Sequence, residues 1–153
     1  MKRFLCVLLS CVIMAGCLPA QTHAANAPGK NIIYLEDMEW EWIDLSTVEL
    51  WDEGIAPQTT HSVNRTISAH SIGSVVSSRF FEARSIITFN CSYSPSSASM
   101  DFGVLTPDGK FYSINGKGGS INQTVEISQA GNYSVAIRNN SSQTVSVVGF
   151  VEY

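Results

Sequence analysis

Two histidines are the residues of this chain best suited to acid–base catalysis. His61 and His70 lie among serines and threonines, and a Ser–His–Asp arrangement would need such neighbours. The chain has no Gly-x-Ser-x-Gly sequence, however, which is the turn that exposes a nucleophilic serine in one large class of hydrolases. Cys91 alternates with Ile87 and Phe89, so it is predicted to be a buried apolar residue. The sequence therefore predicts no enzyme and no catalytic residue.

Residues that could ligate a metal are also sparse. Two histidines nine positions apart and one cysteine do not make the ligand set of a zinc site. Asp101, Asp108 and Glu126 could offer oxygens to calcium, but no Asp-x-Asp-x-Asp-Gly run is present. Asp108 lies in Thr106-Pro-Asp-Gly109, where proline fixes φ and glycine accepts a positive φ, which is typical of a turn. We expect neither a metal nor a cofactor.

Three tryptophans are the strongest candidates for ligand binding. Flat aromatic rings bind sugars, so Trp40, Trp42 and Trp51 could form the binding surface of a carbohydrate-binding module. Aromatic side chains more often lie against a core, and burial at the edge of the fold is the interpretation that we favour. Exposure of these rings would instead indicate a surface for a ligand or a partner, because contiguous exposed apolar patches are uncommon.

The charge of the chain is concentrated in the region of the tryptophans. Eight acidic residues and no lysine or arginine lie between Glu36 and Glu53, whereas five acidic and six basic residues follow from Gly54 onward. Binding to nucleic acid depends on clustered basic residues, so nucleic acid is not expected as a partner. The same argument excludes a polybasic patch that binds membrane lipids. The remaining candidates are an unknown protein or a glycan at the cell surface.

The N-terminus has the pattern of an export signal. Met1-Lys2-Arg3 is followed by an apolar run to Leu18 and by small residues, which predicts a signal peptide over residues 1–24, cleaved after Ala24. An alternative is lipidation of Cys17, because Met14-Ala15-Gly16-Cys17 resembles a bacterial lipoprotein signal. The first interpretation predicts a secreted protein, and the second predicts a lipid-anchored protein of the cell envelope. The membrane is expected to be contacted only through one of these two segments.

Cysteine usage limits how the exported domain is stabilised. Three of the four cysteines, Cys6, Cys11 and Cys17, lie in the predicted signal peptide, so Cys91 has no partner for an intrachain disulfide. The length of 153 residues suits one domain that folds on its own apolar core. Residues 25–59 form an acidic, tryptophan-containing N-terminal segment or linker. Within it, the spacing of residues 32–51 is compatible with either a helix or two short strands.

Alternating apolar residues predict β-strands through the rest of the chain. The clearest strand runs over residues 85–93, with Ile87, Phe89, Cys91 and Tyr93 facing inward. Serine-rich residues 69–78 are predicted to be a loop, in which Val75-Val76 could form a short strand. About seven or eight short strands separated by turns are typical of an all-β, antiparallel β-sandwich over residues 60–153.

The last two apolar runs are predicted to form a pair. Residues 132–139 and 143–153 flank Asn139-Asn-Ser-Ser142, whose side chains favour a turn. Gly149 interrupts the alternation of the second run. A β-bulge at Gly149, or a strand buried on both faces, would explain that interruption.

Several of these strand and turn sequences resemble a known family. Phe81 to Ile87, Asp101-Phe-Gly-Val-Leu-Thr-Pro-Asp-Gly109 and Ala130-Gly-Asn-Tyr-Ser-Val135 are similar to the bacterial pre-peptidase C-terminal domain. The resemblance covers roughly residues 60–153 and implies a small jelly-roll-like sandwich on a secreted protein. It also implies a non-catalytic accessory domain, although the enzyme that such domains accompany is not in this chain. We therefore expect a secreted binding or accessory protein of the bacterial cell surface or medium. The alternatives are the carbohydrate-binding module and the lipid-anchored protein that docks a protein partner.

Overall fold

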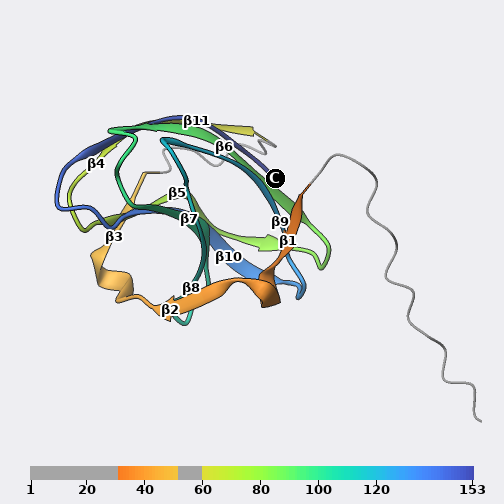
Figure 1. Cartoon of the computed structure of the whole chain (residues 1–153). Coiled ribbons are helices and arrows are strands. Elements are labelled where there is room, and N and C mark those ends of the chain that lie inside the picture. The colour runs from red at the N-terminus through yellow and green to blue at the C-terminus, as the bar shows by residue number, and fades with distance from the viewer. Residues whose placement is uncertain (1–30, 52–59) are drawn as a thin grey trace, which may run out of the picture.

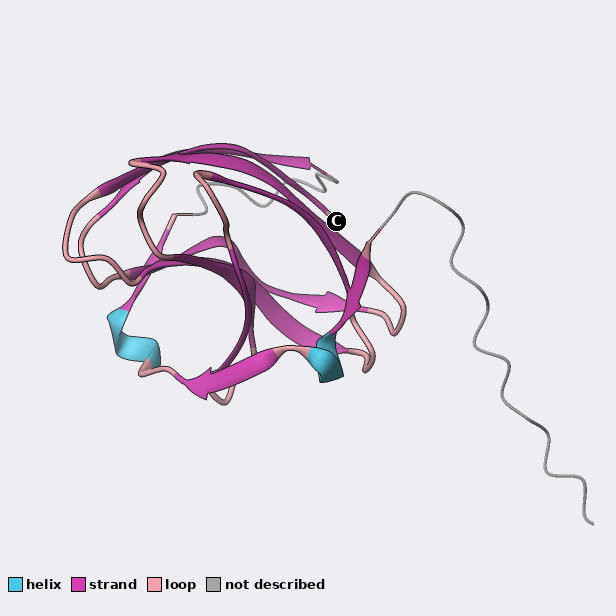
Figure 2. Cartoon of the chain, in the orientation of Figure 1, coloured by secondary structure: helices cyan, strands magenta, loops and turns pink. Residues whose placement is uncertain are grey.

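The computed structural model describes residues 31–51 and 60–153. The predicted signal peptide, its cleavage after Ala24 and the lipidation of Cys17 fall outside the described residues. Two β-sheets pack face to face as a sandwich, and the only helical elements in the described part are two short 3₁₀ turns (Figures 1 and 2). No helix within the described ranges is long and apolar enough to cross a lipid bilayer.

Eleven strands are present in the described residues. They are β1 Ile32–Tyr34, β2 Glu39–Trp42, β3 Val48–Leu50, β4 Thr60–Ile67, β5 Ile72–Phe81, β6 Ile86–Ser94, β7 Met100–Leu105, β8 Lys110–Asn115, β9 Ser120–Glu126, β10 Gly131–Asn139 and β11 Val145–Glu152. The 3₁₀ turns are η1 Leu35–Asp37 and η2 Leu45–Thr47. One sheet has the order β1-β9-β6-β11-β4, and the other has the order β2-β8-β7-β10-β5-β3.

The eight strands from β4 to β11 follow the jelly-roll path. Their order is β4-β11-β6-β9 in one sheet and β5-β10-β7-β8 in the other, and each strand is antiparallel to its neighbours. The chain changes sheet at every connection except the one between β7 and β8. This arrangement of two Greek keys is the jelly-roll topology. The expectation of an all-β, jelly-roll-like sandwich is confirmed.

The core lies between the two sheets and is formed by the alternating residues. Ile87, Phe89, Cys91 and Tyr93 of β6 are all buried, as the sequence predicts. Phe89 meets Phe102 of the opposite sheet edge to face, with ring centroids 6.1 Å apart. Side chains from both inner faces therefore interdigitate in one apolar layer. Each fully buried aromatic or aliphatic side chain contributes about 1.5–3 kcal/mol relative to exposure.

The N-terminal segment completes both sheets. Residues 32–50 form three short strands and two 3₁₀ turns, so the choice between helix and strand is settled in favour of strands. β1 pairs parallel with β9, β2 pairs antiparallel with β8, and β3 pairs parallel with β5, which makes both sheets mixed. Leu35 and Met38 lie between β1 and β2 and belong to the buried core. The described part of the acidic segment is thus integral to the sandwich.

A second, smaller apolar cluster lies apart from the main core. It joins Ile72, Leu105, Phe111 and Ala136 of four neighbouring strands, with Ile43 and Val48 packed against them. Ile43 and Val48 flank η2, which connects β2 and β3 at the two edges of the six-stranded sheet. The backbone N–H of Ile43 also donates to the carbonyl oxygen of Gly109 at 2.8 Å. The connection between β2 and β3 is therefore held against the sheet.

Two local predictions are wrong. Residues 132–139 and 143–153 do not pair, because β10 lies between β5 and β7 while β11 lies between β4 and β6 in the other sheet. The turn after Asn139 carries the chain from one sheet to the other. Residues 69–78 are mostly strand, since β5 begins at Ile72 and pairs with both β10 and β3. A serine-rich composition therefore did not prevent strand formation at a central position.

Gly149 serves neither of the roles expected for it. The pairing of β11 with β4 and β6 runs through Gly149 in continuous register, so the strand has no bulge there. Val148 and Phe150 face outward, so the strand is buried on one face only. A Cβ atom at Gly149 would lie 2.2 Å from the carbonyl oxygen of Asn90, which is too close for any larger residue. Close backbone approach explains the glycine.

We predict that Val135→Asp destabilises the fold severely. Val135 is completely buried on β10, and an unpaired carboxylate there should lower the free energy of unfolding by about 3 kcal/mol or more. The matched control is Val148→Asp on β11, where the valine is 56% exposed. Urea denaturation should show a large loss for the first variant and little change for the second. Equal stability of the two variants would contradict the inward orientation of Val135.

Candidate functional site

Two of the three tryptophans are on the surface. Trp40 and Trp42 project from the same face of β2 and are 50% and 60% exposed, so the burial that we favoured from the sequence is wrong for both. β2 is an edge strand of the six-stranded sheet: β8 pairs with one side of it, and no described strand pairs with the other side. Adjacent exposed indoles on an edge strand are uncommon unless they contact another molecule.

The two indole rings form a corner rather than a flat platform. Their centroids are 5.9 Å apart and their planes are nearly perpendicular, at 88°. Lys110 lies opposite Trp42 in the pairing of β2 with β8. Its Nζ is 5.0 Å from the Trp40 centroid and 5.3 Å from the Trp42 centroid, which places the ammonium group within reach of both ring faces. We call Trp40, Trp42 and Lys110 the Trp corner.

Trp51 is not part of this corner. It follows β3 at the opposite edge of the six-stranded sheet and packs on the core. Its ring covers Gly73 so closely that a Cβ atom there would lie 1.9 Å from the indole. Its Nε1 donates to Glu49 at 3.1 Å, and its carbonyl oxygen accepts from Arg65 at 2.9 Å. Trp51 is therefore a structural residue, and the three tryptophans do not form one surface.

A cavity of about 520 Å³ adjoins the Trp corner. Lys110 belongs to both, and Tyr112, which lies opposite Trp40 in the strand pairing, lines the cavity. We call it the Tyr112 cavity. Its lining consists of Leu35, Glu36, Thr106, Asp108, Lys110, Tyr112, Ser128, Gln129 and Tyr133. Its volume falls in the range of small-molecule sites, and apolar and polar groups converge on it as in such sites.

The predicted turn forms one wall of this cavity. The hydroxyl of Thr106 donates to the carboxylate of Asp108, and the N–H of Gly109 donates to the Thr106 carbonyl at 3.0 Å. Gly109 has a φ of +95°, the positive value that the sequence requires of it. The Thr106 hydroxyl oxygen also accepts from the N–H of Lys110 at 2.9 Å. These contacts fix the backbone from which Asp108 and Lys110 reach the site.

Two tyrosines supply the aromatic part of the cavity. Burial raises the pKa of Tyr133 above its usual value, and the neighbouring Tyr112 raises this pKa further. The Tyr133 hydroxyl therefore stays protonated at neutral pH, and it donates to the carbonyl oxygen of Gln129 at 3.0 Å. Tyr133 is thus a neutral group, and the two tyrosines present their rings and hydroxyls to the cavity.

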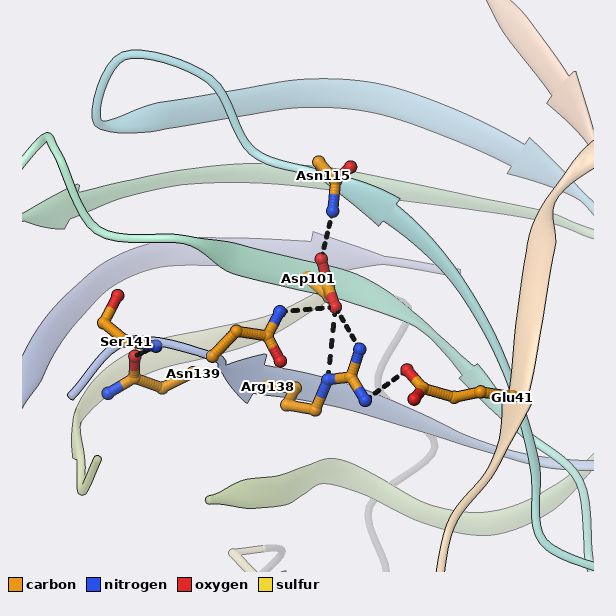
Figure 3. Close-up of polar contacts among 7 residues, drawn as sticks. Glu41, Asp101, Asn115, Arg138, Asn139 and Ser141 are labelled. Atoms are coloured by element: carbon orange, nitrogen blue, oxygen red, sulfur yellow. Dashed lines mark hydrogen bonds and ion pairs between the residues drawn. The ribbon is translucent and has the colours of Figure 1, made fainter. Parts of the chain in front are cut away.

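A cluster of polar side chains on the six-stranded sheet is centred on the buried carboxylate of Asp101 (Figure 3). Asn115, Asp101 and Arg138 lie side by side on three adjacent strands. The carboxylate accepts from Asn115, from Arg138 Nε at 3.1 Å and Nη2, and from Asn140 at 2.7 Å. Because it is buried, this carboxylate needs its charged and neutral donors.

Arg138 connects this cluster to the strand of the tryptophans. Its Nη1 forms an ion pair with Glu41 of β2, and Figure 3 shows the Glu41 side chain directed from β2 toward the guanidinium group. Glu41 lies between Trp40 and Trp42 in the sequence, so its side chain is on the opposite face of the strand. The ion pair links one face of β2 to β10 of the same sheet. The two indoles project from the other face of β2 and are exposed.

The remaining candidate residues do not assemble into a catalytic or metal site. No group of three or more histidine, cysteine or acidic side chains is placed to hold a metal ion in residues 31–51 and 60–153. Burial raises the pKa of the Cys91 thiol to about 11, so this thiol is protonated and unreactive at neutral pH. Asp101 is occupied by Arg138 and its neighbours, while Asp108 accepts from the turn residue Thr106.

Comparison with known proteins gives no assignment. Neither the models of known families nor the curated proteins contain a match to this chain. The candidate site consequently stands on geometry alone. The sequence pattern gave no indication that Lys110 and Tyr112 belong to the site, although both alternate with Ile114 on one face of β8. It also missed the pairing of Glu41 with Arg138, which lie far apart in the sequence.

We predict that Arg138→Met lowers the stability more than the loss of one surface ion pair would. The substitution leaves the Asp101 carboxylate buried without its cation, which should cost about 3 kcal/mol. The double variant Arg138→Met with Asp101→Asn should regain part of this loss, because the buried charge is then removed. Urea denaturation of both variants tests the coupling. A double variant less stable than Arg138→Met alone would contradict it.

Proposed function

We propose that this chain is an exported, non-catalytic binding protein of the bacterial cell surface or medium, and that it binds a glycan at the Trp corner and the Tyr112 cavity. The observation that carries the proposal is the exposure of two adjacent indoles beside a cavity lined by polar side chains. If these two tryptophans served only the stability of the fold, their indole rings would be buried in the core and not exposed to solvent. The resemblance to pre-peptidase C-terminal domains supports an accessory rather than a catalytic role.

The chemistry of the site suits a sugar. A pyranose ring has a C–H face that packs on an indole and hydroxyl groups that both donate and accept hydrogen bonds. Trp40 and Trp42 offer the aromatic faces, while Lys110 donates and Glu36 and Asp108 accept. The perpendicular rings suit a single sugar unit or a bend in a chain better than a long flat polymer.

A protein partner is the second candidate. Acidic residues neighbour the exposed indoles in the sequence, and such a segment would suit a basic partner. Tryptophan is also enriched in the energetically dominant positions of protein interfaces. We favour the glycan because the polar groups converge on a concave cavity. A stable protein–protein interface would need a contact surface broader than this cavity and the Trp corner.

We predict that Trp40→Ala and Trp42→Ala each weaken glycan binding about tenfold, or about 1.4 kcal/mol. A glycan array followed by calorimetry with the best ligand measures the effect. The matched control is Phe80→Ala, which removes an aromatic ring that is 57% exposed on β5. Binding should be unchanged in the control. The absence of any bound glycan, or equal binding by all variants, would exclude the sugar and leave the protein partner.

We predict that the exported protein begins at Ala25. Cleavage after Ala24 removes the basic and apolar start of the chain and leaves no lipid. Mass spectrometry of the protein recovered from a bacterial expression host measures the mature N-terminus. A diacylated Cys17 as the first residue would instead establish a lipid-anchored envelope protein, in which the sandwich is tethered to the membrane.

A further inference from the structure

A cation already lies beside the two exposed indoles. Lys110 of β8 shares one face of the sheet with Trp40 and Trp42 of the neighbouring strand, and its Nζ lies 5.0 Å and 5.3 Å from their ring centroids. The face of an indole carries negative potential, so an ammonium group at such a distance is attracted to it. Because the two ring planes stand at 88° to each other, the ammonium group contacts aromatic surface on two sides.

The rings hold this ammonium group without a carboxylate. Among the described residues, no acidic side chain forms an ion pair with Lys110. The nearby Asp108 carboxylate accepts from the Thr106 hydroxyl. Lys110 is only half-buried, and its long, flexible stem allows Nζ to turn toward solvent. Contacts between a cation and exposed rings are weak, so a ligand that carries its own ammonium group can displace Lys110.

The charge of the site favours a cationic ligand over an anionic one. Glu36, Asp108 and Lys110 are the charged residues that line the Tyr112 cavity, so two carboxylates face one ammonium group. Residues 32–51, which include β2, contain six acidic side chains and no lysine or arginine. Glu36 is exposed and forms no ion pair with a described residue, so its carboxylate is available to a ligand. A cleft of one sign of charge concentrates ligands of the opposite sign.

We propose that the glycan bound at the Trp corner contains amino sugars whose amino groups are free and protonated. The ammonium group of one sugar unit takes the position that Lys110 Nζ now occupies between the indoles, and Lys110 turns toward solvent. Glu36 and Asp108 balance the added positive charge from the side of the Tyr112 cavity. This proposal rests on the glycan function above, because it names the class of sugar for the same site.

Three probes separate the charge of the ligand from its sugar backbone. The trimer of glucosamine and the trimer of N-acetylglucosamine share one backbone, but only the first carries ammonium groups. Tetramethylammonium carries a cation without a sugar. Mildly acidic pH keeps the glucosamine amines protonated and the protein carboxylates ionised. Calorimetry on the mature chain measures the affinities, and NMR spectroscopy follows the indole N–H signals. Trp51, whose N–H donates to Glu49, is the internal reference.

We expect the glucosamine trimer to bind about tenfold more tightly than the N-acetylated trimer. Tetramethylammonium should shift the indole signals of Trp40 and Trp42 and leave that of Trp51 in place. Glu36→Gln keeps a hydrogen-bond acceptor but removes the charge. It should therefore weaken binding of the glucosamine trimer about threefold, and more than binding of the N-acetylated trimer.

Lys110→Met gives effects of opposite sign on the two trimers. The substitution keeps the length of the side chain and removes the competing ammonium group, so it should strengthen binding of the glucosamine trimer about threefold. It should weaken binding of the N-acetylated trimer, for which Lys110 is a hydrogen-bond donor. The matched control is Lys117→Met, which removes the same charge from an exposed residue beyond the end of β8 and should change neither affinity.

The outcomes separate the class of sugar from the glycan function. If the N-acetylated trimer binds at least as tightly as the glucosamine trimer, or if Lys110→Met weakens binding of both, the amino sugar is overturned and the glycan function stands. If tetramethylammonium shifts the indole signals but neither trimer binds, the amino sugar is overturned together with the glycan function, and the corner is a site for another cation. If no probe binds, the cation site is overturned as well.

Discussion

The open side of the sandwich between β8 and β9 is the constraint on which the rest of this structure depends. Two packed sheets leave apolar side chains accessible at their edges, and no disulfide is available to the described chain to compensate. The N-terminal segment covers this side by placing Leu35 and Met38 in the core. Its strands must then pair with β9 and β8. That pairing creates the exposed edge that bears Trp40 and Trp42.

An ion pair also holds the N-terminal segment in place, in addition to the apolar packing of Leu35 and Met38. The N-terminal segment is acidic, and Arg138 of β10 supplies a cation that forms an ion pair with Glu41 of this segment. Arg138 is in turn held by Asp101, whose burial makes the pairing strongly dependent on geometry. The same guanidinium group lies 5.5 Å from the ring centroid of Phe111. One arginine thus connects the sheet, the second apolar cluster and the strand of the candidate site.

Alternation along the chain was a good guide to the face of each strand and a poor guide to its neighbours. It identified the inward residues of β6 because burial on one face imposes a period of two. It wrongly paired β10 with β11, since proximity in sequence favours a hairpin while the jelly-roll path sends consecutive strands to opposite sheets. It also missed most of β5. The serines of that strand are tolerated because its neighbours β10 and β3 satisfy the backbone.

The sequence by itself determined the all-β sandwich, the buried state of Cys91 and the turn at Asp108, because each depends on local pattern or composition. The jelly-roll order was implied only by the family resemblance, and the strand pairing of the tertiary structure decided it. Only the tertiary structure decided that Trp40 and Trp42 are exposed while Trp51 packs on Gly73. An indole has the same propensity at all three positions, so its exposure depends on what lies across from it. For Trp51 that surface is provided by β5, whereas β2 is an edge strand with solvent beyond it.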